Sequence, residues 1–503
     1  MTNLLEFIHT HFEDDPAKLI LAKSKWPDID VIAAANTIST YRRLKSKVPS
    51  WYACPNLIFP YKLASEQCSS EATARYKAQF LATHIAPLLD LPPHNDDLPT
   101  PTDNDLPTPT DDVPTPTDDV PTPTDERPKL RIADITSGMG IDDYFFTAVA
   151  EMLIYNDMNP DLVRAAQHNF DVMNVHNVVF TNQMIVSENI NEWLGDFRPN
   201  VIFADPARRS SEGKKVFLIE DCSPDILGML DAIFANTRHL LLKLSPMADI
   251  TMACSRLGRH CREVHVIGYE GECKELLIWM DREWDDDYSI TCVEIQDNKE
   301  SKDNTDNKSS LVTKKISFNP SDEKNALPLI INKEILNDAI QDSSDRSNKS
   351  NKSNQWLLFE PGKALMKAGC FNTLTQSWPL LKLGRSTHLF LLPIDSSLTD
   401  STSDSSATNH INKDSIGTQS EEIIKELSGM GKLFIIKEIL PLNNKNIKAV
   451  GKAYPHSEVT AKNLPMTSEV LRKKMGVASG DDAHIFGLKT DAAANLLFIT
   501  DRL

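Results

Sequence analysis

The sequence predicts an α/β protein built around a doubly wound parallel sheet, with a helical region before the sheet and small α/β domains after it. Three observations predict this fold class. Between residues 128 and 284, short apolar runs alternate with segments long enough for crossover helices. Most of these runs are apolar throughout, as burial on both faces of a sheet requires. The first run leads into a loop of small residues and then into a helical pattern, which is typical of the ligand-binding edge of such a sheet.

The first 92 residues are predicted to form a helical N-terminal domain. Leu4, Ile8 and Phe12 recur at helical spacing. Ser70 followed by Glu71 is typical of a helix start, because a hydroxyl can cap the first turn and an acid there suits the helix dipole.

Residues 93–127 are predicted to be a disordered acidic linker. They repeat the letters PTPTD with a period of seven, and the prolines exclude a helix. The whole chain has a net charge of −18, and this linker together with Asp395–Glu422 holds most of the excess acid. In Ile423–Met475, lysine and arginine outnumber acids. The overall charge therefore does not exclude a nucleic-acid partner.

Residues 128–284 are predicted to form the doubly wound domain. Its expected strands are Leu130–Ile135, Met152–Tyr155, Val178–Phe180, Val201–Ala204, Leu240–Leu244, Val264–Ile267 and Leu276–Trp279.

Residues 285–434 are predicted to form a small α/β domain interrupted by insertions rich in Ser, Asn, Asp and Lys, and residues 435–503 a further one. The expected elements are strands at Pro328–Ile331, Trp356–Phe359, His388–Pro393, Leu433–Ile439, His484–Leu488 and Asn495–Thr500, and a helix at Ser468–Lys474.

Other features argue against several classes of protein. No C-x-x-C pair occurs among the eight cysteines, so a zinc ribbon or thioredoxin-type site is not expected, and we predict no metal. The N-terminus lacks the basic and apolar regions of a signal peptide, and no stretch approaches about 18 apolar residues. We therefore expect a cytoplasmic protein without membrane contact. The sequence does not specify an oligomeric state.

The loop after the first strand carries the main candidate site. Asp134 ends the strand, and Gly138 and Gly140 allow the backbone to approach a ligand closely. Asp157 follows the second strand, where an acid accepts hydrogen bonds from ribose hydroxyls. A structural turn could also explain the two glycines, and a helix cap could explain Asp157. The loop lacks a third glycine and has Asp143 in that place, which would repel a pyrophosphate, so the sequence favours S-adenosylmethionine over a dinucleotide.

A second candidate feature is the end of the fourth strand. Asp205 is delivered to the same sheet edge, where it could orient a substrate NH or OH or remove its proton. Pro206 fixes the backbone there, and Arg208 could hold an anionic group. The alternative is a strand-end turn followed by solvated arginines.

Together these motifs resemble class I S-adenosylmethionine-dependent methyltransferases with a Rossmann-like sheet. Asp134–Asp142 is similar to the family's first motif, with Thr136 where many members have a glycine, and Asp205–Arg208 is similar to the motif after strand four. The resemblance makes Asn182 a candidate for the adenine side. Glu66–Glu71 precedes the first strand, a position from which such enzymes often fold a segment over the cofactor.

A closer resemblance covers most of the chain. Segments such as Glu66–Glu71, Leu242–Met247 and Glu272–Leu276 are similar to a bacterial group of these methyltransferases that also carries a ferredoxin-like domain and a C-terminal THUMP-like domain. The resemblance implies that residues 285–434 are the ferredoxin-like domain and residues 435–503 the THUMP-like domain.

THUMP-type domains usually engage RNA, so the resemblance implies an RNA substrate. The residues expected to hold its phosphates are Lys462, Arg472, Lys473 and Lys474. A solvated helix face would explain the same basic cluster. Two other functions stay open: a small-molecule or protein methyltransferase, and a non-catalytic RNA-binding protein with a vestigial cofactor site.

Overall fold

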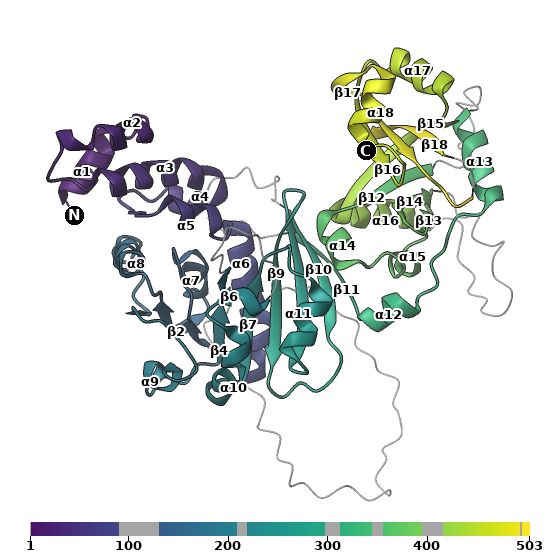
Figure 1. The fold of residues 1–503 in the computed structure, drawn as a ribbon. Coiled ribbons are helices and arrows are strands. Elements are labelled where there is room, and N and C mark those ends of the chain that lie inside the picture. Colours follow the sequence, from purple (N-terminus) through teal and green to yellow (C-terminus); the bar gives the residue numbers. More distant parts are fainter. Residues whose placement is uncertain are drawn as a thin grey trace, which may run out of the picture. The chain divides into compact units, whose positions relative to one another are not determined.

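The computed structural model describes residues 2–89, 130–208, 219–296, 312–344, 356–394, 416–492 and 495–503. Figure 1 shows the labelled helices and strands in chain order, and the chain forms two compact units. Unit 1 comprises residues 1–207 and 223–241, and unit 2 comprises residues 208–222 and 242–503. Among the described residues, no helix is long and apolar enough to cross a membrane.

The N-terminal part of unit 1 is helical, as predicted. Ser70 caps the last long helix of this region by accepting a hydrogen bond from the backbone N–H of Thr73 at 3.2 Å, which confirms the expected helix start. Asp15 and Asp30 cap earlier helices in the same way. The elements are α1 (Thr2–Thr10), α2 (Pro16–Leu21), η1 (Lys23–Lys25), α3 (Val31–Lys47), α4 (Pro49–Tyr52), α5 (Lys62–Gln67), α6 (Glu71–Phe80), η2 (Leu81–Ile85) and η3 (Ala86–Leu89).

The rest of unit 1 alternates strands and helices, which confirms the predicted doubly wound pattern. Strand β1 pairs in parallel with β2 on one side and with β4 on the other, and β3 extends the sheet next to β2. The elements are β1 (Leu130–Asp134), α7 (Ile141–Phe146), β2 (Ala150–Asn156), α8 (Pro160–Val172), β3 (Val178–Thr181), α9 (Ile190–Leu194), β4 (Val201–Ala204) and α10 (Ile226–Asn236). The chain passes from one unit to the other within β5 (Ala207–Arg208), within β6 (Cys222–Ser223) and within β7 (His239–Leu244), and η4 (Ile219–Asp221) belongs to unit 2.

The helical region packs directly on the sheet domain within unit 1. The ring of Trp51 lies edge-on to the rings of Tyr144 and Phe170, at 5.7 and 6.4 Å between centroids. The side chain of Asn169 on α8 accepts a hydrogen bond from the backbone N–H of Ile58 at 2.7 Å and donates one to its carbonyl at 2.9 Å. Residues before β1 therefore form part of one core with the sheet domain.

Unit 2 begins with a group of strands that continue past residue 284. Strands β8 and β9 form an antiparallel hairpin, β10 pairs in parallel with β8, and β11 pairs antiparallel with β10. The sequence predicted neither β10 nor β11. The elements are α11 (Ile250–Leu257), β8 (Cys261–Tyr269), β9 (Glu272–Asp281), β10 (Ser289–Gln296), β11 (Val312–Phe318), α12 (Pro320–Asn325) and α13 (Lys333–Ser344).

The remainder of unit 2 is a seven-stranded sheet in the order β13-β14-β12-β15-β18-β17-β16. Helix α13 packs on one face, around Phe486 and Phe498, and α17 and α18 pack on the other, around Ile485 and Ile499. The elements are β12 (Trp356–Pro361), α14 (Lys363–Ala368), α15 (Leu374–Ser377), β13 (Leu381–Gly384), β14 (Thr387–Pro393), α16 (Ile416–Met430), β15 (Gly431–Pro441), α17 (Asn444–Ala453), β16 (His456–Lys462), α18 (Ser468–Met475), β17 (Ala478–Leu488) and β18 (Leu496–Arg502).

A buried carboxylate joins the two groups of strands in unit 2. Glu294 on β10 is 9% exposed, and its Oε1 accepts a hydrogen bond from the backbone N–H of Ala364, in the first turn of α14, at 3.2 Å. A Cβ on Gly268 or Gly362 would lie 2.4 or 2.5 Å from its oxygens. The two glycines therefore make room for this carboxylate.

Some expectations are corrected or fall outside the described residues. The strand predicted at Pro328–Ile331 is wrong, because only Ile330 makes an isolated bridge, to Lys382. The predicted linker at residues 93–127 and most of the polar insertions lie outside the described residues. The division into domains at residues 92, 127, 284 and 434 stays a prediction.

Candidate active site

The first strand of unit 1 ends in a buried carboxylate that folds onto the loop after it. Asp134 is 1% exposed, and its Oδ1 accepts hydrogen bonds from the backbone N–H and the hydroxyl of Thr136, at 2.7 and 3.3 Å. The hydroxyl oxygen of Thr136 in turn accepts a hydrogen bond from the backbone N–H of Asp205 at 2.6 Å. Thr136 thus ties the end of β1 to the end of β4, which a glycine at this position could not do.

The two glycines of the loop serve different purposes. Both have left-handed backbones, with φ of 59° at Gly138 and 78° at Gly140. A Cβ at Gly140 would lie 3.0 Å from the ring of Phe170 and 3.2 Å from that of Tyr155, so this glycine permits close packing. Among the described residues, a Cβ at Gly138 would have one atom within 4 Å, the Thr136 carbonyl oxygen at 3.9 Å. The space beside Gly138 is therefore open for a ligand.

Asp157 lies just past β2 and contacts this loop directly. Its Oδ2 accepts a hydrogen bond from the backbone N–H of Gly138 at 3.1 Å, and its Oδ1 accepts one from the backbone N–H of Asn159 at 2.7 Å. Asn159, not Asp157, caps helix α8. Burial raises the pKa of Asp157, while the two backbone hydrogen bonds lower it. The structure therefore places Asp157 at the loop rather than in the capping position.

The other predicted cofactor residue, Asn182, lies next to Asp157. It follows β3, and its Nδ2 donates a hydrogen bond to the backbone carbonyl of Asp157 at 2.7 Å. The ends of β1, β2 and β3 therefore bring together Asp134, Gly138, Asp157 and Asn182, all four of which the sequence singled out.

The structure describes the side chains of two of the three predicted substrate residues, Asp205 and Pro206. Asp205 is half-buried and Pro206 is buried, directly after β4. Because β1 and β4 run parallel with Asp134 opposite Phe203, Asp205 lies at the same sheet edge as the loop. Arg208 ends β5, and its side chain lies outside the described residues.

The site edge is rich in buried acid. Burial raises the pKa of Asp134 well above its usual range, and the nearby charges of Asp142 and Asp205 raise it further. The pKa of the fully buried Asp143 is raised in the same way, by burial first and then by Asp134 and Asp142. Such an environment favours a ligand with positive charge.

A buried lysine beside this loop was missed from the sequence. Lys77 on α6 is 0% exposed, and its Nζ lies 3.2 Å from Asp142 Oδ1. Ser69 donates a hydrogen bond to Asp142 Oδ2 at 2.8 Å, so the segment Glu66–Glu71 does reach the first turn of α7. A single lysine in a helical pattern normally indicates a solvated face, and only its place after the Ser69-Ser70 start could have drawn attention to it.

The predicted basic residues lie in unit 2. Lys462, on β16, forms an ion pair with Glu360 at 2.9 Å. Arg472, Lys473 and Lys474 occupy the last turn of α18, where Lys473 pairs with Glu469 at 3.0 Å. Three further exposed lysines, which were not predicted from the sequence, lie along one side of α17: Lys445, Lys448 and Lys452. Their spacing of three and four residues was the signal available.

Among the described residues, no group of three or more His, Cys, Asp or Glu side chains could hold a metal ion.

Two segments match family models. Residues 357–393 match a ferredoxin-like domain, and residues 431–502 match a THUMP domain-like family. The chain therefore carries both of these domains, as the resemblance implied.

Among solved structures, a protein from Porphyromonas gingivalis W83 proposed to be a methyltransferase matches over 99% of this chain and 97% of that chain, with a TM-score of 0.67 and 22% identity. This likeness establishes a shared fold over nearly the whole length. A ribosomal protein L11 methylase from Lactobacillus delbrueckii subsp. bulgaricus has a TM-score of 0.22 and 12% identity, covering 31% of this chain and 72% of that one. An rRNA methylase from Streptococcus thermophilus has a TM-score of 0.23 and 11% identity, covering 30% and 87%. No curated protein matches this chain.

Proposed function

We propose that this protein is an S-adenosylmethionine-dependent methyltransferase that acts on RNA in the cytoplasm. The observation that carries the proposal is the convergence of three side chains at one sheet edge. Of the adjacent parallel strands β2, β1 and β4, β1 ends in Asp134, while Asp157 and Asp205 directly follow β2 and β4. Hydrogen bonds through Gly138 and Thr136 connect these three residues. Open α/β sheets bind ligands at this edge.

The residues present fit S-adenosylmethionine. Each oxygen of Asp157 accepts one backbone hydrogen bond, and a carboxylate has about four acceptor positions, so the two ribose hydroxyls can be accommodated. The open space beside Gly138 suits close approach of the ligand. The buried acid Asp134 suits the ammonium and sulfonium groups, where phosphates would be repelled, while Asp142 is paired with Lys77. Asn182, beside Asp157, would lie on the adenine side.

Bound S-adenosylmethionine supplies an electrophilic methyl group. The residues of the chain must then align a nucleophile with this methyl group and accept the proton that the nucleophile loses. Catalysis of this kind depends chiefly on positioning. Asp205 would accept a hydrogen bond or a proton from the attacking NH or OH. Thr136 holds the backbone of Asp205 in place, and Pro206 restricts the backbone that follows. Arg208 would hold an anionic part of the substrate.

The RNA assignment rests on the C-terminal domain. The THUMP-like segment contains α17 and α18, which present the residues that we call the α17–α18 basic face: Lys445, Lys448, Lys452, Arg472, Lys473 and Lys474. The two helices approach closely, since a Cβ on Gly451 would lie 2.0 Å from the carbonyl oxygen of Met475. Six basic side chains on two packed helices form a surface suited to a phosphate backbone. Lys462 would join them after giving up its ion pair with Glu360.

The test is incubation with methyl-labelled S-adenosylmethionine and separate RNA, protein and metabolite extracts. We expect the label in RNA, with nucleoside analysis identifying the methylated base, and no label in any extract with the Asp205→Ala variant. Label found only in protein or metabolites would refute the RNA assignment while leaving the methyltransferase assignment intact.

A further inference from the structure

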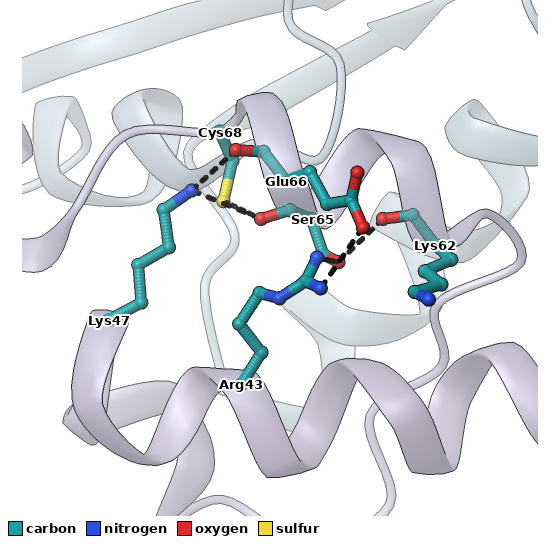
Figure 2. Close-up of polar contacts among 6 residues, drawn as sticks. All are labelled: Arg43, Lys47, Lys62, Ser65, Glu66 and Cys68. Carbon is teal, nitrogen blue, oxygen red and sulfur yellow. Dashed lines mark hydrogen bonds and ion pairs between the residues drawn. The ribbon is translucent and has the colours of Figure 1, made fainter.

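The segment that precedes α6 is fastened to α3 by two basic side chains. We call residues 62–70 the strap. Figure 2 shows Arg43 and Lys47 projecting from the same helix towards it. Lys47 Nζ donates hydrogen bonds to the carbonyl oxygens of Ser65 and Glu66, at 3.1 and 3.0 Å. Arg43 donates to Ser65 Oγ at 3.2 Å and to Glu66 Oε1 at 3.0 Å. Both main chain and side chains of the strap are therefore held.

The other end of the strap reaches the helix that follows the glycine loop. Ser69 Oγ donates to Asp142 Oδ2 at 2.8 Å, and Lys77 Nζ donates to Ser69 Oγ at 3.1 Å. Lys77 Nζ also lies 3.2 Å from Asp142 Oδ1, which closes a triangle of three buried side chains. Asp142 is two residues beyond Gly140, so a displacement of Asp142 would be transmitted directly to the loop.

Further contacts hold α6 in place against α7. Arg75 lies over the ring of Phe145, 4.8 Å from its centroid, and bonds to Glu71 Oε1 through two nitrogens at 2.9 and 2.7 Å. Glu71 Oε2 accepts a hydrogen bond from the backbone N–H of Ser50 at 2.9 Å. The strap therefore lies between two fixed points, α3 and α7.

We propose that Ser69 and Lys77 are positioning residues of the cofactor site and that the N-terminal helical region is an integral part of that site. The inference rests on the proposed binding of S-adenosylmethionine. Burying a carboxylate without a partner is unfavourable, and Asp142 has Asp134 and Asp143 as acidic neighbours. The ammonium of Lys77 and the hydroxyl of Ser69 hold Asp142 in one position, and thereby set the first turn of α7 and the loop before it.

The experiment compares three variants of the full chain by calorimetry with S-adenosylmethionine. Lys77→Met removes the charge and keeps the length of the side chain, Ser69→Ala removes only the hydroxyl, and Lys77→Arg keeps the charge. Lys62→Met is the matched control, because Lys62 is an exposed lysine of the same strap. We expect Lys77→Met to raise the dissociation constant by at least about tenfold and Ser69→Ala by several-fold, with partial recovery in Lys77→Arg and no change in the control.

Two additional readouts separate positioning from general stability. The proposal predicts that kcat at saturating S-adenosylmethionine stays close to wild type while KM for the cofactor rises. It also predicts that cofactor binding slows amide hydrogen exchange across the strap in wild type, and less so in Lys77→Met.

The outcomes distinguish a failure of the positioning role from a failure of the proposed cofactor binding. Unchanged cofactor affinity in Ser69→Ala and in a folded Lys77→Met overturns the inference, as does an absence of cofactor-dependent protection in the wild-type strap. If Lys77→Met fails to fold, Ser69→Ala alone decides, because it leaves the ion pair in place. If the wild-type protein itself fails to bind S-adenosylmethionine, the proposed function is at fault instead.

Discussion

The carboxylate of Asp157 accepts a hydrogen bond from the backbone N–H of Gly138, with 3.1 Å between Oδ2 and the nitrogen. The acid that follows the second strand thus directly contacts the glycine loop that follows the first strand. The Tyr155 hydroxyl donates to the carbonyl of the same glycine at 2.5 Å, so both peptide groups flanking this position are held from β2. The open space beside Gly138 therefore has a fixed boundary.

Replacing Asp157 should weaken cofactor binding. Asp157→Ala removes the acceptor for ribose and also frees the N–H of Gly138. Hydrogen bonds to charged groups contribute about 1.5–3 kcal/mol each, so the dissociation constant for S-adenosylmethionine should rise by about 10- to 100-fold. Calorimetry measures this, and circular dichroism should show an unchanged fold. Asp157→Asn, which keeps one oxygen acceptor, should have an intermediate effect, and wild-type affinity in the alanine variant would refute the ribose role.

Replacing Asp205 should separate turnover from cofactor binding. The backbone N–H of Asp205, and not its side chain, is the group that bonds to Thr136, so truncation leaves this link intact. We expect Asp205→Ala to lower kcat by at least about 100-fold, in line with loss of a general base, while affinity for S-adenosylmethionine stays within about twofold. Single-turnover methyl transfer provides the measurement. A variant that turns over at the wild-type rate would mean that Asp205 is a structural strand-end residue.

The sequence was most informative where strands are purely apolar. Val201–Ala204 was predicted with the observed bounds, and the residue after it, Asp205, then lies at the sheet edge by necessity. By contrast, β10 contains Thr291 and Glu294 among its buried residues. Because these polar residues interrupt the apolar pattern, the sequence did not predict this strand of eight residues. Buried polar groups depend on partners far away in the chain, which periodicity cannot reveal.

The same limit explains which site residues were missed. Asp134, Gly138 and Asp157 follow strands at regular places, so their convergence could be predicted. Lys77 is buried only because Asp142 and Ser69 lie opposite it in the fold. From the sequence alone it reads as an ordinary surface lysine of an amphipathic helix.

Glu294 should make the stability of unit 2 depend on pH. Burial raises the pKa of Glu294 to about 7, whereas the pKa of a glutamate in an unfolded chain is about 4.3. Between these values the folded state binds more protons than the unfolded state, so the stabilisation is present at low pH and is lost as pH rises towards 7. The loss is at most about 4 kcal/mol.

The check is the melting temperature of wild type and Glu294→Gln at pH 5 and pH 8. Glutamine keeps an oxygen to accept the hydrogen bond from Ala364 and has no charge to bury. At pH 5 the two proteins should differ little in melting temperature, and the variant should melt several degrees higher than wild type at pH 8. A difference that is independent of pH would contradict the burial of an ionisable Glu294.

Charge reversal on the α17–α18 basic face should weaken RNA binding in a salt-dependent way. The variants are Lys448→Glu and Lys474→Glu. Both lysines lie on helices that pack against the Ile485 face of the sheet. Each lost phosphate contact should reduce the slope of log affinity against log salt by about 1. Lys333→Glu is the matched control, since α13 packs on the opposite face of the same sheet. Equal effects of all three variants in filter-binding assays would argue against a defined RNA face.

The central claim is that the edge formed by β2, β1 and β4 holds the methyl donor. Its most direct test is calorimetric titration of the full-length protein with S-adenosylmethionine, with NAD as the comparison ligand. We predict one site per chain for S-adenosylmethionine and no binding of NAD, because the loop has Asp143 in the place of the third glycine of a dinucleotide site. Absence of any heat of binding with S-adenosylmethionine at millimolar concentration would contradict the claim.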